Sequence, residues 1–394
     1  MRILFVTARP PWPSRRGDQA RTAGWVRELG RRHELSVVAL TPPGFQASSF
    51  PPGVAGRAVP VSRLATIAAL PRAVRLPGQV ALHVSTRLRR AFDDERERFR
   101  PDVVVPVLSR VGWLAEPDCG VPGAGVPTVI DLVDSLALNF ENRARRQRLL
   151  APLLRWEARR VAAWDRRLAA CLSAATVVSQ RDRRSLVDGA PELASKVHVV
   201  PFGVSVPADP PAPPGGDVVL LSGNLGYFPT VDGAVWFAAE VWPRIRELRP
   251  AAVWRLAGAR PARPIRRLSA LPGVELHAEP ADLGALRRAA AVAVVPLGSG
   301  SGTPIKTLEA MADGVPVVTT SWGRQGLDAI DGDAVAVADA PEAFAGEVVR
   351  LLDDRRAAAA QSRRAWEWLR QRHDLERVAA SFEALLRGAV EGRA

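Results

Sequence analysis

Short apolar runs that alternate with longer amphipathic stretches constrain this 394-residue chain more than any other feature. Runs of this length, rich in Val, Leu and Ala, are typical of buried strands, and the stretches between them have helical spacing. Regular alternation of this kind predicts helices packed on parallel sheets, an α/β fold. The predicted strands cover residues 2–8, 35–40, 102–107, 126–131, 174–179 and 196–201, and then 217–223, 252–257, 273–276, 291–296, 315–319 and 333–338. The predicted helices cover residues 18–32, 81–99, 141–170 and 181–188, and then 231–248, 282–289, 304–313, 341–353, 356–372 and 375–390.

A proline-rich segment, residues 207–216, divides the pattern into halves of near-equal length. It contains five prolines and no apolar period, which is typical of a stiff linker. We therefore expect an N-terminal Rossmann-like domain over 1–206 and a C-terminal Rossmann-like domain over 217–370. The last stretch, 371–394, is expected to pack back toward the N-terminal domain. Two such doubly wound domains would face each other across a cleft, where ligands of parallel sheets bind.

Composition narrows the class of protein. An apolar fraction of 47% is that of a globular protein, and no apolar run is long enough to span a membrane. The first apolar run stops at Arg9-Pro10-Pro11, so no signal peptide is expected. Cys119 and Cys171 show neither metal-ligand spacing nor a disulfide framework, which favours a reducing cytoplasm.

The positive charge of the chain is confined to its first half. Residues 1–208 hold 32 basic and 18 acidic side chains, whereas residues 209–394 hold 22 and 23. Basic surface raises the rate of encounter with anionic partners. The scattered histidines and the Asp331-Gly-Asp333 turn lack metal-ligand spacing, so we expect neither a metal site nor a cofactor.

One of only two lysines in the chain, Lys306, follows a glycine-rich loop. The predicted strand 291–296 leads into Gly298-Ser-Gly-Ser-Gly-Thr303, and Pro304 then opens a helix. Loop amides and a helix N-terminus form a cradle for anions, and the lysine adds a compact positive charge. Glu309, one turn further along the same helix face, could accept hydrogen bonds from hydroxyl groups. This pattern predicts a site for a sugar nucleotide, although a solvated lysine and an acid favoured by the helix dipole are the plain alternatives.

The segment from Leu221-Ser-Gly-Asn-Leu-Gly-Tyr-Phe-Pro229 through this motif to Gly314-Val-Pro-Val-Val318 resembles the GT4-type glycosyltransferases of GT-B fold. The opening Arg2-Ile-Leu-Phe-Val6, followed by Arg16-Gly17-Asp18, is similar to that family's first strand and glycine loop. The resemblance implies transfer of a sugar from a nucleoside diphosphate to an acceptor hydroxyl, with retention of configuration and without metal. A phosphate oxygen of the donor would then take the acceptor's proton.

The resemblance also implies roles for residues. Lys306 would contact the donor diphosphate and stabilise the leaving group, and Glu309 would bind the ribose. The remaining donor-binding candidates are Gly223, Asn224, Gly300, Gly302, Thr303 and Pro304. The family commonly has two glutamates with seven residues between them, and the earlier position is Ser301 here. This departure leaves the identity of the donor open.

In the first half, the loop before Asp18 supplies candidates for the acceptor side. Trp12 offers an apolar platform, Arg16 a charge and Gly17 close approach of the backbone. Tryptophan packing and a helix cap at Asp18 are the alternatives. Asp134 follows the predicted strand 126–131, and by resemblance it lies where the acceptor or the transferred sugar would sit. A helix N-cap is an equally good interpretation of Asp134.

Residues 143–167 hold nine arginines interspersed with leucines and tryptophans. This basic amphipathic pattern is consistent with peripheral contact with an anionic membrane at its cytoplasmic face. A solvated face above a buried apolar stripe explains it equally well. The acceptor could be a small molecule, a glycan or a lipid-linked sugar.

Three other functions remain open on the sequence. A nucleotide-sugar epimerase of the same architecture would need acids and histidines that the pattern does not supply. A nucleic-acid-binding protein would explain the arginines, but no nucleic-acid-binding motif is present and no such partner is expected. A pyridoxal enzyme using Lys306 or Lys196 is conceivable.

Overall fold

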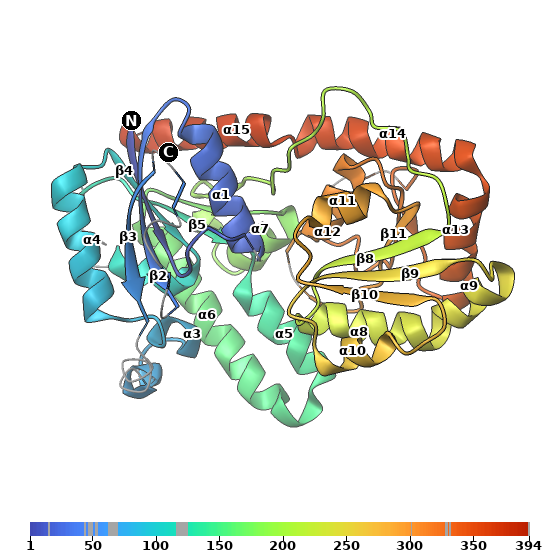
Figure 1. The fold of residues 1–394 in the computed structure, drawn as a ribbon. Coiled ribbons are helices and arrows are strands. Elements are labelled where there is room, and N and C mark those ends of the chain that lie inside the picture. The colour runs from blue at the N-terminus through green and yellow to red at the C-terminus, as the bar shows by residue number, and fades with distance from the viewer. Residues whose placement is uncertain are drawn as a thin grey trace. The chain divides into compact units, whose positions relative to one another are not determined.

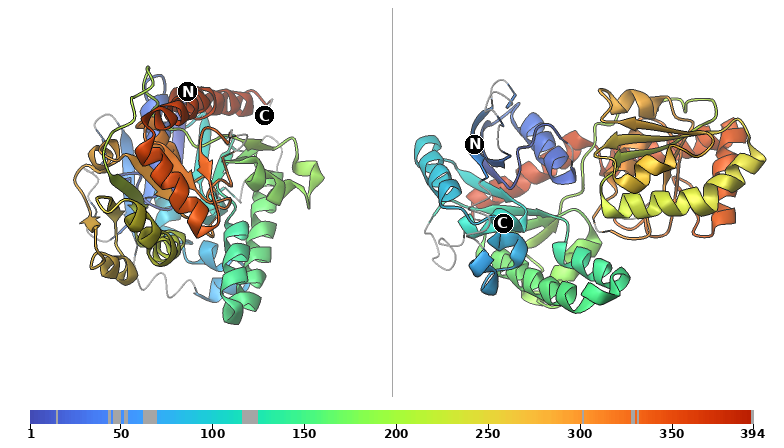
Figure 2. Two further views of the ribbon diagram at one scale, coloured as in Figure 1. Left: turned by 90° about the vertical axis from the view of Figure 1, so that its right-hand side faces the viewer. Right: turned by 60° about the horizontal axis from the view of Figure 1, so that its bottom comes forward.

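The computed structural model describes residues 1–14, 16–42, 45, 50–51, 54–61, 70–115, 125–300, 302–327, 330 and 332–392. The chain divides into two compact units. Unit 1 comprises Met1–Gly203 with Glu376–Ala394, and unit 2 comprises Val204–Leu375. Each unit is built on one parallel sheet (Figures 1 and 2), which confirms the predicted α/β class.

The sheet of unit 1 has seven strands in the order β3-β2-β1-β4-β5-β6-β7, all parallel. The chain therefore starts in the middle of the sheet, winds to one edge and then returns to build the other half. Its strands are β1 (Arg2–Thr7), β2 (Glu34–Thr41), β3 (Ala55–Pro60), β4 (Val103–Val107), β5 (Val129–Val133), β6 (Ala174–Val177) and β7 (Val197–Val199).

Helices cover the sheet of unit 1, and alternate residues of each strand face different helices. Leu4 and Val6 of β1 pack with Leu88 and Phe92 of α4, whereas Ile130 of β5 packs against α6. The helices of unit 1 are α1 (Gly17–Leu29), α3 (Gly78–Ala81), α4 (Thr86–Phe99), α5 (Leu136–Arg146), α6 (Ala151–Cys171), α7 (Gln180–Val187) and α15 (Leu375–Val390). Short 3₁₀ helices cover Leu70–Val74, Ser109–Leu114, Arg148–Leu150 and Pro191–Leu193.

Two features of unit 1 differ from the prediction. The sequence pattern missed β3, an edge strand of Ala, Gly, Arg, Val and Pro with little apolar character. The single helix predicted over 141–170 is wrong, because the chain breaks at Gln147 and forms α5 and α6. Pro152 lies in the first turn of α6, where its missing N–H and fixed φ favour a new helix start.

A buried ion pair joins α1 to the centre of this sheet. The Nε of Arg21 donates to Asp131 Oδ2 at 2.7 Å, and both side chains are almost fully buried. Asp131 also accepts from Trp25 Nε1 at 3.1 Å and from Thr176 Oγ1 at 2.9 Å. Trp25 in turn stacks on Phe382 of α15, with the ring centroids 4.7 Å apart. This network holds α1, β5, β6 and the C-terminal helix in one core.

The sheet of unit 2 has six parallel strands in the order β10-β9-β8-β11-β12-β13. Its strands are β8 (Val218–Asn224), β9 (Val253–Ala259), β10 (Val274–Ala278), β11 (Val292–Val295), β12 (Val317–Thr319) and β13 (Ala336–Val337). Its helices are α8 (Phe228–Trp236), α9 (Trp242–Leu248), α10 (Arg263–Leu268), α11 (Leu283–Arg288), α12 (Ile305–Ala312), α13 (Pro341–Asp353) and α14 (Arg355–Arg372).

An aromatic cluster fills one face of this sheet. Phe237 lies between Trp254 of β9, at 4.7 Å between centroids, and Phe344 of α13, at 5.8 Å. Phe237 belongs to a π-helical turn, Phe237–Val241, that separates α8 from α9. The helix predicted over 231–248 is therefore interrupted, because Pro243 cannot donate a helical hydrogen bond.

The proline-rich segment 207–216 is held on unit 2. Trp366 Nε1 of α14 donates to Pro207 O at 3.0 Å, and Arg370 Nη1 donates to Ala208 O at 3.0 Å. Arg355 Nη2, also on α14, donates to Pro213 O at 2.9 Å. Side chains of one helix therefore fix the path of this segment.

The cysteine spacing indicated no disulfide framework, and for Cys171 this prediction is wrong. This residue ends α6 and is disulfide-bonded in the structure. Cys119 lies outside the described residues. Spacing alone carries no information on a pairing made by tertiary structure.

We expect Arg21→Met to lower the free energy of unfolding by about 3–5 kcal/mol, because it leaves the buried Asp131 carboxylate without its cation. Urea denaturation would measure the loss. Arg2→Met is the matched control, since its pair with Asp102 is 3.8 Å long and about 40% exposed on both sides and should contribute less than about 1 kcal/mol. Equal losses in the two variants would contradict the assignment of Asp131 as a buried, charged partner.

Candidate functional site

The candidate donor site lies at the carboxyl ends of β8 and β11 in unit 2. These two strands are neighbours at the centre of the sheet, and the chain leaves them in opposite directions. Loops at such a switch point diverge and leave a crevice, which is where parallel sheets bind ligands. Gly223 and Asn224 end β8, and the loop that follows β11 leads to Lys306 on α12.

The ammonium of Lys306 is partly buried and has a neutral hydrogen-bond partner. Its Nζ donates to Thr230 Oγ1, in the first turn of α8, at 2.8 Å. Burial lowers the pKa of Lys306 to about 8, although the nearby Glu309 carboxylate raises it. A desolvated cation of this kind gains more from a bound anion than a solvated lysine does. The solvated-lysine alternative therefore does not describe Lys306.

Gly223 lies against the side chain of Lys306. Its φ of +117° lies in a region that favours glycine, and a Cβ there would be 3.6 Å from Lys306 Cε. In the neighbouring strand, a Cβ at Gly258 would be 1.7 Å from Gly223 O. The two glycines let β8 and β9 approach closely beside the amine.

Asn224, also predicted to bind the donor, shapes the turn after β8. Its Oδ1 accepts a hydrogen bond from Gly226 N at 3.1 Å. This bond leads the chain toward α8, whose first turn carries Thr230. Asn224 therefore has a structural role in this conformation.

Two helix N-termini in this region are free of side-chain caps. Tyr227 precedes α8 and Pro304 precedes α12, and neither side chain caps its helix. Uncapped first-turn N–H groups and the helix dipole favour an anion. Gly300 (φ +126°) and Gly302 (φ +71°) shape the loop before α12.

The hydroxyl of Thr303 ties this loop to another part of unit 2. Its Oγ1 donates to Gly326 O at 3.1 Å. Ser301, the position of the missing glutamate, lies outside the described residues. The hydroxyl of Ser299, in the same loop, is buried and accepts no hydrogen bond from the described residues. A polar atom in such a position is a candidate ligand contact.

Glu309 has a partner that sequence reasoning missed. Arg287 Nη1 of α11 lies 3.3 Å from Glu309 Oε2, while its Nε donates to Asp313 at 2.7 Å. Burial raises the pKa of Glu309, Asp313 raises it further, and Arg287 lowers it. The Glu309 side chain is 36% exposed, so its carboxylate remains accessible to a ligand.

The acceptor candidates of unit 1 lie between the end of β1 and the start of α1. Arg9 Nη1 donates to Asp18 Oδ2 at 2.7 Å. Arg16 is the N-cap residue of α1, so Asp18, in the first turn, does not cap the helix as the alternative proposed. Gly17 is simply the first residue of the helix. Trp12 packs edge-on against Phe50 at 6.2 Å between centroids, which supports the packing alternative for this residue.

Asp134 lies in a group of charged residues at the carboxyl edge of β4 and β5. Burial raises the pKa of Asp165 to about 7 and that of Asp182 to about 6, and the charge of Asp134 contributes to both. Burial lowers the pKa of Arg110 to about 10, while Asp18 and Asp134 raise it. Asp134 and Asp18 therefore act on the same guanidinium. Ser135, rather than Asp134, is the N-cap of α5.

Arg110, Asp165 and Asp182 were not found from the sequence. Arg110 follows the predicted strand 102–107 directly, so the rule that sites form at strand carboxyl ends would have indicated it. Asp165 and Asp182 lie within helices, and their sequence positions carry no comparable signal.

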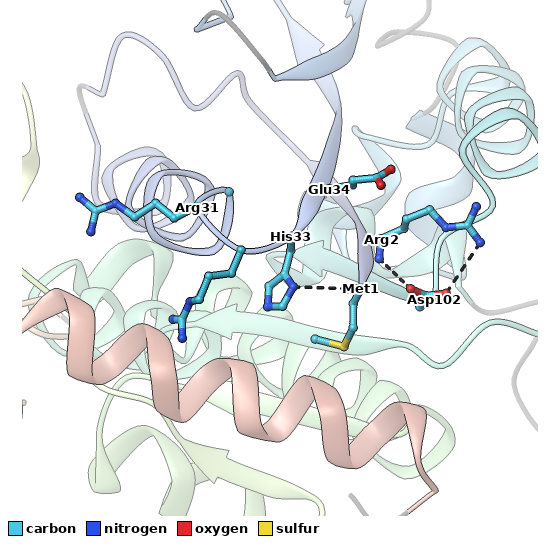
Figure 3. Close-up of a pocket in the computed structure, with 8 residues that line it drawn as sticks. Met1, Arg2, Arg31, His33, Glu34 and Asp102 are labelled. Carbon is cyan, nitrogen blue, oxygen red and sulfur yellow. Dashed lines mark hydrogen bonds and ion pairs between the residues drawn. The ribbon is translucent and has the colours of Figure 1, made fainter.

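The opposite edge of the unit 1 sheet has a pocket of about 650 Å³ lined by Met1, Arg2, His33, Glu34 and Asp102 among others (Figure 3). The backbone N of Arg2 donates to Asp102 Oδ2 at 2.7 Å. These residues lie at the amino ends of β1, β2 and β4, where parallel sheets do not place their ligand sites. We therefore do not assign the pocket to the candidate site.

The described residues contain no group of three His, Cys, Asp or Glu side chains arranged to hold a metal ion. Among them there is likewise no helix that is both long and apolar enough to cross a bilayer.

Part of the chain matches the model of a known protein family. Residues 216–354, which carry the whole candidate donor site, match the model of the family described as glycosyl transferases group 1. No curated protein matches the sequence.

Solved structures match over nearly the whole chain. A sucrose-phosphate synthase from Thermosynechococcus elongatus has a TM-score of 0.70 at 15% identity, covering 98% of both chains. HepE from Anabaena, in complex with UDP, has a TM-score of 0.67 at 14% identity and covers 98% of this chain and all of its own. WaaG, a glycosyltransferase involved in lipopolysaccharide biosynthesis, has a TM-score of 0.63 at 14% identity with the same coverage.

The fold is GT-B. The structural neighbours share this fold, and the family match shows that residues 216–354 are similar to group 1 glycosyl transferases. The predicted cleft between the two domains and the roles of individual residues stay predictions.

The hydrogen bond from Lys306 to Thr230 can be tested by NMR, because a protein labelled at lysine ¹³Cε gives signals from only two lysines. We expect the Lys306 signal to titrate near pH 8 and its pKa to fall further in Thr230→Val, since the charged amine loses its acceptor. The signal of Lys196, which donates to the carbonyls of Ala170 and Leu172, is the internal control and should not change. A Lys306 pKa that stays constant or rises in Thr230→Val would contradict the described environment.

Proposed function

We propose that this protein is a GT4-type enzyme that transfers a sugar from a nucleoside-diphosphate sugar to an acceptor hydroxyl, with retention of anomeric configuration and without a metal ion. The observation that carries the proposal is the partly buried ammonium of Lys306 at the switch point of unit 2, hydrogen-bonded to a neutral hydroxyl beside two uncapped helix N-termini.

Lys306 would stabilise the departing diphosphate. Negative charge on the bridging oxygen grows as the bond to the anomeric carbon breaks, and a cation already in place lowers the free energy of that state. The helix N-termini of α8 and α12 would hold the phosphate oxygens. Because these groups are fixed before the donor binds, little reorganisation is needed during the reaction.

Glu309 would accept hydrogen bonds from the ribose hydroxyls of the donor. Arg287 holds its Oε2 from one side at 3.3 Å, which fixes the carboxylate while leaving it partly exposed. In the same proposal a phosphate oxygen of the donor takes the proton of the acceptor hydroxyl, so unit 1 need not supply a base.

Asp134 would contact the acceptor or the transferred sugar from unit 1. Its support is its place at the carboxyl edge of β5, in the same charged group as Arg110 and Asp18. A carboxylate in that group can orient sugar hydroxyls by accepting their hydrogen bonds.

We expect release of UDP from UDP-sugars, with UDP chosen first because HepE is seen in complex with it. Lys306→Ala should reduce the rate by about 10²–10³, the effect of removing one stabilising group from a developing oxyanion. Lys196→Ala is the control, since it removes the chain's other lysine from unit 1. Failure of UDP, GDP, TDP and ADP sugars to react or to bind by calorimetry would overturn the proposal.

The affinity for UDP should depend on pH through Lys306. The amine has a pKa of about 8 in the free protein, and a bound diphosphate raises that pKa, so binding above pH 8 requires uptake of a proton. The dissociation constant measured by calorimetry should then increase by up to about tenfold for each pH unit above 8.

Lys306→Arg is the matched control for this pH dependence. A guanidinium stays charged throughout the range, and the titration of UDP itself is common to both proteins. A Lys306→Arg variant that loses affinity above pH 8 as steeply as the wild type would assign the dependence to another group.

A further inference from the structure

The turn between α5 and α6 exposes large apolar side chains. Leu149 is 98% exposed, Leu153 is 59% exposed, and Leu150 and Trp156 are each half exposed. Figures 1 and 2 show α5 and α6 side by side as a hairpin whose turn points away from the sheet of unit 1. We name residues 148–156 the hairpin tip.

Folding of the hairpin does not need these side chains. Leu154, Ala158 and Val161 form the inner face of α6 and pack against Phe140 and Ala144 of α5. Leu153 and Trp156 are three residues apart and share the outer face. The apolar stripe that the core requires is therefore complete without them, and the tip carries a second apolar surface exposed to solvent.

The apolar side chains of the basic amphipathic segment 143–167 fall into a buried group and an exposed group. Leu154, Val161 and Trp164 belong to the core, as the alternative interpretation holds. The tip keeps Leu149, Leu150, Leu153 and Trp156 outside. The buried-stripe interpretation therefore describes one face of the hairpin, and the membrane interpretation concerns only the other face.

The charges around the tip are almost all positive. Exposed arginines flank it at positions 143, 145, 148, 155 and 159. The nearby Glu157 is half-buried and lies 3.4 Å from Arg160, whose guanidinium also covers the Trp156 ring at 4.3 Å. Segments that lie in the headgroup region of a bilayer typically have exposed Leu and Trp side chains surrounded by arginines.

We propose that the hairpin tip docks on the surface of an anionic lipid bilayer. Leu149, Leu150, Leu153 and Trp156 enter the boundary between headgroups and acyl chains, while the arginines contact lipid phosphates. Charge complementarity identifies an anionic lipid surface as the occupant. This inference does not rest on the proposed function, because it concerns a different surface of unit 1.

Vesicle flotation with the full chain tests the proposal. We expect binding to phosphatidylcholine vesicles that contain about 30 mol% phosphatidylglycerol, little binding to pure phosphatidylcholine, and weaker binding as the salt concentration rises. Absence of binding to the anionic vesicles would overturn the proposal, and so would equal binding to both kinds.

Paired variants test whether the tip itself inserts. Leu149→Ser with Leu153→Ser should weaken binding by about tenfold or more, because two apolar side chains no longer leave water. Leu248→Ser with Leu271→Ser is the matched control, since these leucines of unit 2 are 62% and 37% exposed. Wild-type affinity in the tip variant would overturn insertion of the tip.

A second pair separates local charge from the overall charge of +13. Arg148→Gln with Arg155→Gln should weaken binding more than Arg266→Gln with Arg267→Gln, which are exposed on unit 2. If both double variants weakened vesicle binding equally, the binding would depend on overall charge. That result would overturn the proposal that the tip is the docking surface. All four side chains are exposed, so thermal unfolding should confirm that each variant folds.

Discussion

A partly buried ammonium with a neutral partner is the interaction on which the candidate site depends. Removing Lys306 from bulk water costs free energy that the hydroxyl of Thr230 only partly recovers, and the lowered pKa expresses that cost. The surrounding structure holds the Lys306 side chain in this partly buried position. Gly223, beside the side chain, has a backbone conformation that favours glycine, and Gly258 lets the neighbouring strand approach closely. A bound anion would replace part of the solvation that the Lys306 ammonium loses in the fold. The burial that lowers the pKa of this amine should therefore increase the affinity of the site for phosphate.

The location of the site follows from parallel sheet topology more than from any motif. In each unit the first strand lies at the centre, and its neighbours on either side are reached by opposite windings. Residues that follow β8 and β11 meet in unit 2, and residues that follow β1, β4 and β5 meet in unit 1. Strand order is not visible in a sequence, but the ends of apolar runs are. The ends of apolar runs indicated the loop before Lys306, whereas the resemblance to GT4-type glycosyltransferases indicated Gly223 and Asp134.

What the sequence could not supply are the partners made by tertiary structure. Thr230 lies 76 residues from Lys306, just before the helix predicted over 231–248. Arg287 lies 22 residues from Glu309, within the helix predicted over 282–289. The same limit applies to elements that depend on their neighbours. Strand β3 is an edge strand with few apolar residues, and its hydrogen bonds to β2 define it. The breaks within the helices predicted over 141–170 and 231–248 were within reach, because Pro152 and Pro243 mark both of them.

The choice of lysine at position 306 has a physical explanation in a chain that uses arginine at 52 of its 54 basic positions. A guanidinium is planar, keeps its charge at any physiological pH and needs several acceptors in one plane. The space beside Gly223 offers one hydroxyl acceptor and a close glycine backbone, which suits a compact ammonium. Lys196 fits the same rule, because its Nζ reaches two backbone carbonyls, Ala170 O at 2.7 Å and Leu172 O at 3.0 Å, at the end of α6. At both positions the available acceptors therefore suit a small cation with rotatable donors. The amine at position 306 also loses its proton above about pH 8, and a bound anion would favour its protonated form.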